Sequence, residues 1–399
     1  MEIIMYNSKS FFKLTNSIQN YPWGSNTSIP ELFNIQNPDD KPFAEIWMGA
    51  HPKASSEINI DQNALLLRDF ITENIHSSLG EPTATQFGEL PYLFKVLSAK
   101  QALSIQVHPS KKDAKLGFDR ENQAKLHIDA FERNYKDANH KPELVYALTP
   151  FLAMNGFRLF EDIAQQFRKV NIEELKNELS AFEESKNDRG LCSLFTQLLS
   201  LEGERKELVL IELLQWSKNN DDKLAKIILE LNEVYPNDVG LLAPLFLNVI
   251  LLAPGEAMFL DAGTPHAYLK GTALEIMANS DNVLRAGLTP KYIDVTELVS
   301  SCLFVPLKKE NILTQAVINN CEYSFPIPVD DFAFSIYKCP KNHTVNMDRA
   351  EILFAIDADV TVTDTNNQCI TIGKGESIFI PFSTNSYSIT SRGDIARAY

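Results

Sequence analysis

Two histidines and an amide occupy positions from which they could bind a metal ion. Gln106 and His108 lie two residues apart in a segment of alternating apolar and polar residues, which predicts a β-strand. Side chains two apart on a strand share a face, so Ser104, Gln106 and His108 would point to the same side. His266 follows a Gly-Thr-Pro turn at the end of another apolar strand. Each pattern alone also fits a purely structural interpretation: a polar row on a solvated sheet face, and a structural histidine.

A carboxylate completes a candidate ligand set. Residues 139–143 read NHKPE, and Pro142 favours an extended backbone at Lys141, just before Glu143. Alone, this segment is typical of a surface loop. Two imidazoles, one carboxylate and one amide oxygen on β structure form a set with room for a water or a substrate oxygen. The absence of thiolates favours zinc in a catalytic rather than a structural role, and the spacing alone also admits iron or manganese.

The elements that must position these residues fall into three stretches. Residues 1–155 contain short apolar runs separated by Pro, Gly, Asn and Asp, which predicts β structure without the strand-helix alternation of a doubly wound sheet. Residues 160–236 have apolar side chains at helical spacing, which predicts a helical unit whose stripes pack in a core. β texture resumes at residues 245–252 and continues to the end. We therefore interpret the helical unit as an insertion.

The β structure after the helical unit contains an internal repeat. Residues 254–266 align without a gap with residues 374–386, matching a Gly-Glu pair, a Phe and a Thr. A Gly-Glu turn before an apolar strand suits a jelly-roll β-sandwich. His266 aligns with Ser386, so the second copy keeps the framework and loses the polar ligand. We expect chemistry in the first copy only.

The composition excludes several classes of protein. A chain of 399 residues, 44% hydrophobic and 22% charged, predicts a packed protein of about two or three domains. The net charge of −15 excludes a general electrostatic hold on nucleic acid or anionic membrane, so an anionic ligand needs a local basic cluster. Five cysteines without a C-x-x-C pair favour neither a disulfide frame nor a thiolate zinc site. Without a leader-like start or a run of about 18 apolar residues, we expect a cytoplasmic protein.

Four longer motifs resemble the type I mannose-6-phosphate isomerases, also called phosphomannose isomerases, of the cupin superfamily. The motifs occur in family order between residues 20 and 300. The C-terminal part resembles the family only in its general pattern of short apolar strands and turns. The four motifs are PFAEIWMGAHPK at 42–53, LSIQVHP at 103–109, NHKPE at 139–143 and EIMANSDNVLRAGLTPKYID at 275–294.

The resemblance implies a mainly β fold with an all-α insertion. The implied parts are a cupin, or jelly-roll, catalytic domain (residues 1–158 and 242–305), an inserted helical domain (159–241) and a second, jelly-roll-like β domain (306–399). It also implies one zinc ion per chain. The implied ligands are the residues proposed above from face and ligand type: Gln106, His108, Glu143 and His266.

The implied reaction interconverts mannose 6-phosphate and fructose 6-phosphate by proton transfer between C1 and C2 through a cis-enediol. It requires a general base within hydrogen-bond reach of the C2 proton. Glu275 is the candidate base, because apolar neighbours would raise its pKa toward a useful range. Nine residues separate Glu275 from His266, so an unbroken strand would point them to opposite faces, unless Gly271 marks a bulge. Lys141 and His140 are rival proton carriers, and His140 is a candidate for ring opening.

The dianionic phosphate and the developing enediolate require basic side chains. The family's active-site arginine falls on Arg285, which we expect at the reacting end, oriented by Asp281. Lys291 and Lys95 would contact the phosphate, and Tyr268 would form a wall or donate a hydrogen bond. The complete set of predicted substrate contacts is Ser104, Lys95, Tyr268, Asp281 and Lys291.

We therefore predict a zinc-dependent aldose-ketose isomerase that acts as a monomer on a small sugar phosphate, without nucleic acid or membrane as partner. Two alternatives stay open. An Fe(II) cupin oxygenase would use an open triad of two histidines and one carboxylate. A cupin that binds a sugar phosphate without catalysis is the other alternative, and Arg285 and Lys141 argue against it.

Overall fold

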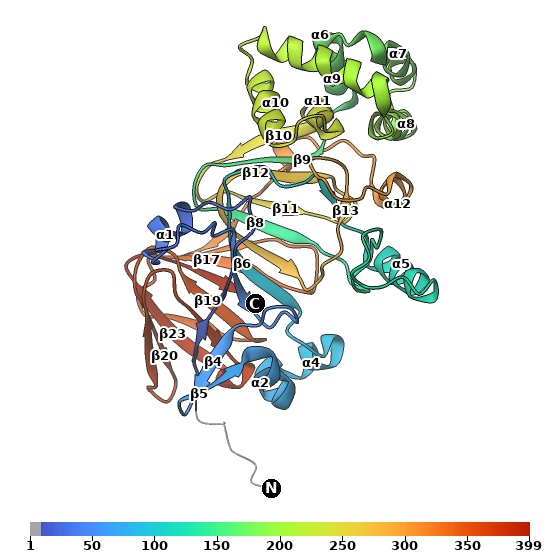
Figure 1. Ribbon diagram of the computed structural model, residues 1–399. Coiled ribbons are helices and arrows are strands. Elements are labelled where there is room, and N and C mark those ends of the chain that lie inside the picture. The colour runs from blue at the N-terminus through green and yellow to red at the C-terminus, as the bar shows by residue number, and fades with distance from the viewer. Residues whose placement is uncertain (1–8) are drawn as a thin grey trace.

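The computed structural model describes residues 9–399 in three parts (Figure 1). A helical unit lies at one end, a large β-sheet occupies the middle, and the C-terminal strands form much of the other end. Residues 1–8, where the expected catalytic domain begins, lie outside the described residues. The mainly β fold with a helical insertion is as predicted. Among the described residues, every helix is too short or too polar to cross a membrane.

The central sheet is organised around one long strand, β12 (His266–Ala278). β12 pairs antiparallel with four other strands, and its first residue, His266, lies opposite both Gln106 and Asn155. The remaining strands of the sheet are β2 (Ser17–Gln19), β3 (Glu45–Gly49), β6 (Tyr92–Ala99), β7 (Gln106–Val107), β8 (Glu143–Ala147), β9 (Phe151–Phe157), β10 (Leu247–Leu252), β11 (Ala257–Leu260), β13 (Leu284–Arg285) and β14 (Leu313–Thr314).

A bulge in β12 resolves the register problem between His266 and Glu275. The pairing of β12 with β9 shifts between Tyr268 and Lys270, so one extra residue enters the strand. Gly271 follows this shift directly. Its φ of 122° is a backbone conformation that is unfavourable for residues with a side chain. Because the extra residue changes the parity of the strand, His266 and Glu275 line the same cavity.

The helical unit forms where the sequence predicts it. The predicted stripes are buried in one core, among them Leu194 and Leu198 in one helix and Ile228 and Leu231 in another. The chain then returns along β10, which pairs with β9, so the unit is an insertion between two paired strands. Its elements are α6 (Phe160–Val170), η1 (Glu173–Leu175), α7 (Lys176–Glu184), α8 (Asp188–Leu199), α9 (Gly203–Lys218), α10 (Lys223–Val234), η2 (Val239–Leu242) and α11 (Ala243–Phe246).

The C-terminal β structure shares a sheet with the N-terminal part of the chain. β22 pairs with β1 (Phe12–Thr15), which pairs in turn with β4 (Glu57–Ile60) and, through it, with β5 (Asn63–Leu66). The expected domain boundaries therefore stay a prediction, because this sheet crosses them. The C-terminal strands are β15 (Val317–Asn319), β16 (Glu322–Phe325), β17 (Phe334–Lys338), β18 (His343–Asn346), β19 (Glu351–Ala355), β20 (Val360–Asp364), β21 (Cys369–Ile372), β22 (Ser377–Ile380), β23 (Ser386–Ser391) and β24 (Asp394–Ala398).

The internal repeat is present in the backbone. In both copies a glycine with positive φ donates its N–H at 2.8 Å to the last residue of a neighbouring strand: Gly255 to Ala147 of β8, and Gly375 to Ala355 of β19. In both copies the next residue, Glu256 or Glu376, closes the turn by accepting a backbone N–H, at 2.8 and 2.9 Å. The aligned residues His266 and Ser386 are each the first residue of the following strand.

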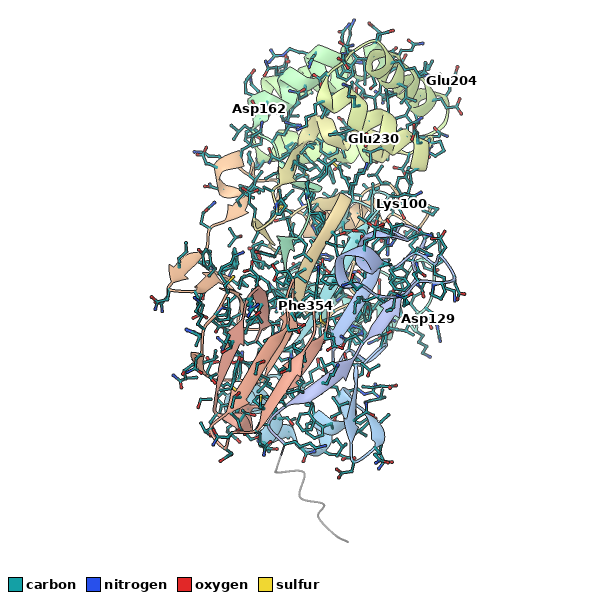
Figure 2. The ribbon with its side chains drawn as sticks, turned by 90° about the vertical axis from the view of Figure 1, so that its left-hand side faces the viewer. Lys100, Asp129, Asp162, Glu204, Glu230 and Phe354 are labelled. Atoms are coloured by element: carbon teal, nitrogen blue, oxygen red, sulfur yellow. The ribbon has the colours of Figure 1, made fainter. Side chains whose placement is uncertain are left out.

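Aromatic packing joins the two β parts. Phe354 in β19 is fully buried and lies within the body of the molecule (Figure 2). Its ring contacts Phe33 and Phe94, with ring centroids 5.2 and 6.3 Å apart. The other helical segments of the described chain are α1 (Ser28–Phe33), α2 (Leu67–Glu73), α3 (Ile75–Leu79), α4 (Glu81–Phe87), α5 (Lys111–Gln123), α12 (Val295–Ser301), η3 (Lys309–Asn311) and η4 (Phe382–Thr384).

The substitution Gly271→Ala tests the bulge. An added Cβ would lie 2.5 Å from the carbonyl oxygen of Pro150, in a backbone conformation unfavourable for alanine, so we expect the free energy of unfolding to fall by about 2 kcal/mol or more. Gly203→Ala is the control: its φ is also positive, but no atom lies within 4 Å of the added Cβ. Chemical denaturation measures both, and equal losses would contradict the proposed steric constraint.

Candidate metal centre

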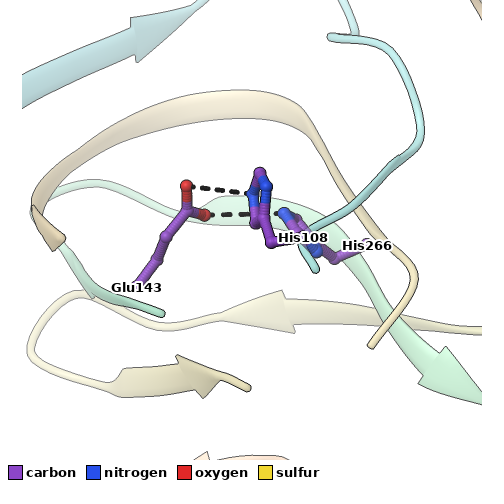
Figure 3. A group of neighbouring side chains, drawn as sticks. All are labelled: His108, Glu143 and His266. Carbon is purple, nitrogen blue, oxygen red and sulfur yellow. Dashed lines mark ion pairs between the residues drawn. The ribbon is translucent and has the colours of Figure 1, made fainter. Parts of the chain in front are cut away.

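His108, Glu143 and His266 converge on one buried point (Figure 3). One ligand atom from each lies within 4.8 Å of the others. His108 follows β7, while Glu143 and His266 are the first residues of β8 and β12, so paired strands of the central sheet carry the group. Nε2 of His108 lies 3.2 Å from Oε1 of Glu143, and Nε2 of His266 lies 3.5 Å from Oε2.

Hydrogen bonds on the far side of each imidazole leave the inner nitrogen free to bind a metal. Nδ1 of His108 lies 2.7 Å from the carbonyl oxygen of Asn282, and Nδ1 of His266 lies 2.9 Å from that of Thr264. A carbonyl oxygen only accepts, so Nδ1 carries the proton and Nε2 keeps its lone pair. Nε2 of His108 is buried and makes no hydrogen bond. Burial is the main reason that the pKa of His108 is lowered to about 4, so its ring is neutral.

Glu143 is an ionised carboxylate in this buried site. Burial alone would raise its pKa, but Lys141, whose Nζ lies 3.2 Å from Oε1, holds the pKa well below its ordinary value. Two imidazoles and one carboxylate are a donor set that suits zinc and other divalent transition metals. The fourth predicted ligand, Gln106, lines the same cavity as Glu143 and His266.

The cavity beside these ligands contains most of the predicted site residues. Its volume is about 60 Å³, roughly the liquid volume of two water molecules. Glu45 also lines it, although the sequence analysis did not select this residue. The predicted residues that line it are Lys95, Ser104, Gln106, Lys141, Glu143, His266, Tyr268 and Glu275.

A buried hydrogen-bond network links Glu143 to Glu275 and Lys95. The hydroxyl of Tyr268 lies 3.1 Å from Oε2 of Glu143 and 2.9 Å from Oε1 of Glu275, and its single proton serves one of them at a time. Nζ of Lys95 lies 2.7 Å from Glu275 and 3.5 Å from Glu45. Burial raises the pKa of Glu275 against the opposing effect of Lys95. Burial would lower the pKa of Lys95, but Glu275 and Glu45 raise it.

Lys95 is buried and already paired with carboxylates. Its ammonium group contacts two carboxylates, and only 7% of its side chain is exposed. Lys95, a candidate contributor to phosphate binding, neutralises Glu45 and Glu275 in the structure. Composition cannot reveal this, because the pairing depends on the register of β3, β6 and β12.

Besides the candidate ligand His108, four predicted residues lie outside the lining of the cavity, and two of them are cationic. Arg285 pairs through its backbone with Gln106, and burial lowers the pKa of its side chain. Burial and the nearby Arg285 lower the pKa of Lys291, with smaller contributions from Lys136 and Lys53. These four cations share one region, and sequence analysis had not assigned Lys53 or Lys136 to it.

Asp281 and His140, the other two, have partners that the sequence did not indicate. Oδ2 of Asp281 lies 2.8 Å from Nζ of Lys53, and no ion pair with Arg285 occurs in residues 9–399. The expected orientation of Arg285 by Asp281 is therefore not seen. Nε2 of His140 lies 2.9 Å from Oδ2 of Asp331, a buried residue between β16 and β17. This contact ties the NHKPE segment to the C-terminal β structure.

Asn282 holds the imidazole of His108 in place through the ring nitrogen that faces away from Glu143. Its side chain is fully buried, donates to the carbonyl of Asn139 at 2.9 Å and accepts the N–H of Lys136 at 2.7 Å. Its own carbonyl accepts from His108. Asn282 lies in the long motif at 275–294, but only the fold reveals its contact with the histidine.

A jelly-roll sheet that directs two imidazoles and an ionised carboxylate at one buried point defines a metal-binding cupin. Three family descriptions match the chain: "Phosphomannose isomerase type I, catalytic domain" at residues 11–160, "Phosphomannose isomerase type I, helical insertion domain" at 167–247, and "Mannose-6-phosphate isomerase, cupin domain" at 322–399. The chain belongs to the type I phosphomannose isomerase family.

Relatives match along almost the whole chain. Mannose-6-phosphate isomerase from Salmonella typhimurium is 49% identical over 97% of this chain and 99% of its own. The human enzyme of that name is 36% identical over 92% and 93%. A zinc-bound crystal structure of mannose 6-phosphate isomerase has a TM-score of 0.94 at 48% identity, covering 98% of this chain and 99% of that chain. The predicted fold class, family and enzyme class are confirmed.

The pH dependence of stability tests the burial of His51, which packs against Trp47 near the centre. Burial lowers its pKa from 6.5 to about 4, so between these values the unfolded chain binds more protons and stability falls as the pH falls. Each pH unit in this window costs at most about 1.4 kcal/mol. We expect His51→Asn to flatten the slope of unfolding free energy between pH 6.5 and 5. The exposed His127 is the control, and His127→Asn should leave the slope unchanged.

Proposed function

We propose that this chain interconverts D-mannose 6-phosphate and D-fructose 6-phosphate with one zinc ion held by Gln106, His108, Glu143 and His266. The observation that carries the proposal is the buried group of His108, Glu143 and His266 in a chain of this family. Zinc is the metal of choice because a solved relative is zinc-bound. When bound, the ion would supply a positive charge that polarises the carbonyl and hydroxyl oxygens of the sugar.

In the proposed reaction, Glu275 removes the proton from C2 and returns it to C1. The oxygen at C1 gains a proton and the hydroxyl at C2 loses one, so the aldose becomes the ketose through a cis-enediol without a redox cofactor. The support is the position of Glu275 in the cavity, together with the raised pKa that burial gives it. Lys95 and Tyr268 hold its two oxygens. Their contacts fix the carboxylate in one orientation.

Lys141 is better placed than His140 as a second proton carrier. Lys141 lines the cavity, and its Nζ contacts Glu143. The imidazole of His140 instead bonds to Asp331, so we assign His140 to positioning of the 139–143 segment. Ser104 also lines the cavity, and we assign its side chain to contact with a sugar hydroxyl.

The phosphate would lie outside the cavity, because the carboxylates of Glu45, Glu143 and Glu275 line it and would repel a dianion. Arg285 and Lys291 lie near each other outside the cavity lining, and Lys53 and Lys136 add positive charge nearby. We propose that Lys291 binds the phosphate, and that the planar fork of Arg285 stabilises the negative charge that develops on the sugar oxygens.

We retain the two jelly rolls and the insertion as the domain division, with boundaries at residues 158, 241 and 305. The return of the chain along β10 supports the insertion. An Fe(II) oxygenase remains the alternative that uses the same two histidines and carboxylate, and metal analysis with an oxygen-uptake assay distinguishes it.

The substitution His266→Ala tests the ligand set. Loss of one imidazole should release the metal and abolish turnover, as should chelation of the wild type, and zinc should restore activity only to the wild type. Metal analysis and a coupled assay for fructose 6-phosphate measure both effects. His76→Ala, at an exposed histidine, is the control. Stoichiometric zinc and a near-normal rate in His266→Ala would rule out this ligand set.

The substitution Arg285→Ala tests the charge assigned to the reacting end. If Arg285 stabilises developing charge, kcat should fall about 100-fold or more while the metal stays bound. Arg189→Ala, at an exposed arginine in α8, serves as the control. A rise confined to KM would instead assign Arg285 to ground-state binding of the phosphate.

A further inference from the structure

A second cationic cavity lies between the helical unit and the central sheet. Its volume is about 260 Å³, and residues from β9, β10, α6, α10 and η3 line it. Four cations and one carboxylate border it, a formal charge of +3 in a chain whose total is −15. The lining shares no residue with the cavity at the candidate metal centre. A basic cluster of this kind is what an anionic ligand needs on an acidic protein.

Arg158 is the lining residue whose side chain is held in place by hydrogen bonds. Its side chain is buried, and both Nε and Nη2 donate to the carbonyl oxygen of Pro244, at 3.2 and 3.0 Å. The other buried arginines of the described chain, Arg133 and Arg397, each contact a carboxylate, whereas none lies within 4.0 Å of Arg158. A carbonyl oxygen accepts hydrogen bonds but does not neutralise a guanidinium, and Asp162 and Asp222 act on Arg158 only from beyond ion-pair distance, so its charge is incompletely compensated.

Three lysines add charge at the border of the cavity. Lys169 forms an ion pair with Asp222, so these two groups largely neutralise each other. Lys223 and Lys309 are exposed, and no ion pair involves either of them within residues 9–399. Arg158, Lys223 and Lys309 therefore remain available to an anion.

Apart from Gln166, the rest of the lining is aliphatic. The aliphatic residues come from the β9–β10 pair and from α10, and 51% of Leu251 is exposed there. Gln166 offers a partner to the hydroxyl groups of one sugar, whereas a flat, largely apolar group would remove the aliphatic surface from water. The aliphatic lining residues are Leu152, Leu224, Ile227, Val249 and Leu251.

We propose that this cavity binds an organic phosphate with an apolar or aromatic body, of the class of nucleoside monophosphates, as a site separate from the catalytic one. The phosphate lies against Arg158, Lys223 and Lys309, and the ring system covers the aliphatic residues. The site contacts β9, the strand that lies opposite the metal-ligating end of β12 at His266. The proposal does not depend on which sugar phosphate the enzyme isomerises.

Calorimetric titration of the metal-loaded protein with adenosine monophosphate tests the proposal. We expect saturable binding that persists in saturating mannose 6-phosphate equilibrated with its product, because the two sites are distinct. The double variant Lys223→Glu with Lys309→Glu should raise the Kd about 10-fold or more, and adenosine without phosphate should bind at least as much more weakly. The control is Lys226→Glu, also an exposed lysine on α10 but paired with Asp221 outside the lining, which should change the Kd less than about two-fold.

Three results would overturn the proposal. Absence of saturable binding would remove the site, and displacement of adenosine monophosphate by mannose 6-phosphate would place the nucleotide in the catalytic site. An equal loss of affinity in Lys226→Glu would show general surface attraction. Because the readout is binding, a failure of the proposed isomerase activity leaves this test interpretable.

Discussion

The burial of the Glu143 carboxylate is the constraint on which the arrangement of the catalytic sheet depends. An ionised carboxylate that is 3% exposed is strongly destabilising unless compensating groups lie close to it. Lys141 supplies one positive charge, and the hydroxyl of Tyr268 supplies a hydrogen-bond donor. The two imidazoles turn lone pairs toward the same point, because carbonyl oxygens hold their Nδ1 protons. A divalent cation would satisfy the carboxylate and both lone pairs at once.

β12 brings this centre and the proposed base into one cavity. Four strands pair with it, so its backbone is fixed along its length, and the bulge near Leu269 changes which face each later residue occupies. Without the bulge, Glu275 would point away from His266. Tyr268 lies just before the bulge and spans the distance between the carboxylates of Glu143 and Glu275. The backbone irregularity therefore brings the candidate metal ligands and the proposed base to one face of the strand.

The sequence predicts the elements of this fold better than their contacts. Helical periodicity located the insertion. The alternating pattern around Gln106 and His108 located a strand, although β7 is only Gln106–Val107 and His108 directly follows it. The position of Lys95 between Glu45 and Glu275, and the bond from Asp331 to His140, depend on pairings between segments far apart in the chain. Local patterns carry no information about such pairings, so the partners of these charges became visible only in the fold.

The two jelly rolls each contain a buried carboxylate at the same position, but its partners differ. β8 pairs with β11 as β19 pairs with β22, and this places Glu351 at the position of Glu143, opposite Ile380 where Glu143 lies opposite Leu260. Glu351 is also fully buried, but Arg397 neutralises it and Tyr387 donates to it. Its charge is therefore satisfied within the protein. The two copies differ at this carboxylate: Arg397 neutralises it in the second copy, whereas Lys141 and two imidazoles lie beside it in the first, and of the two arrangements it is the first that offers a set of donors to a metal ion.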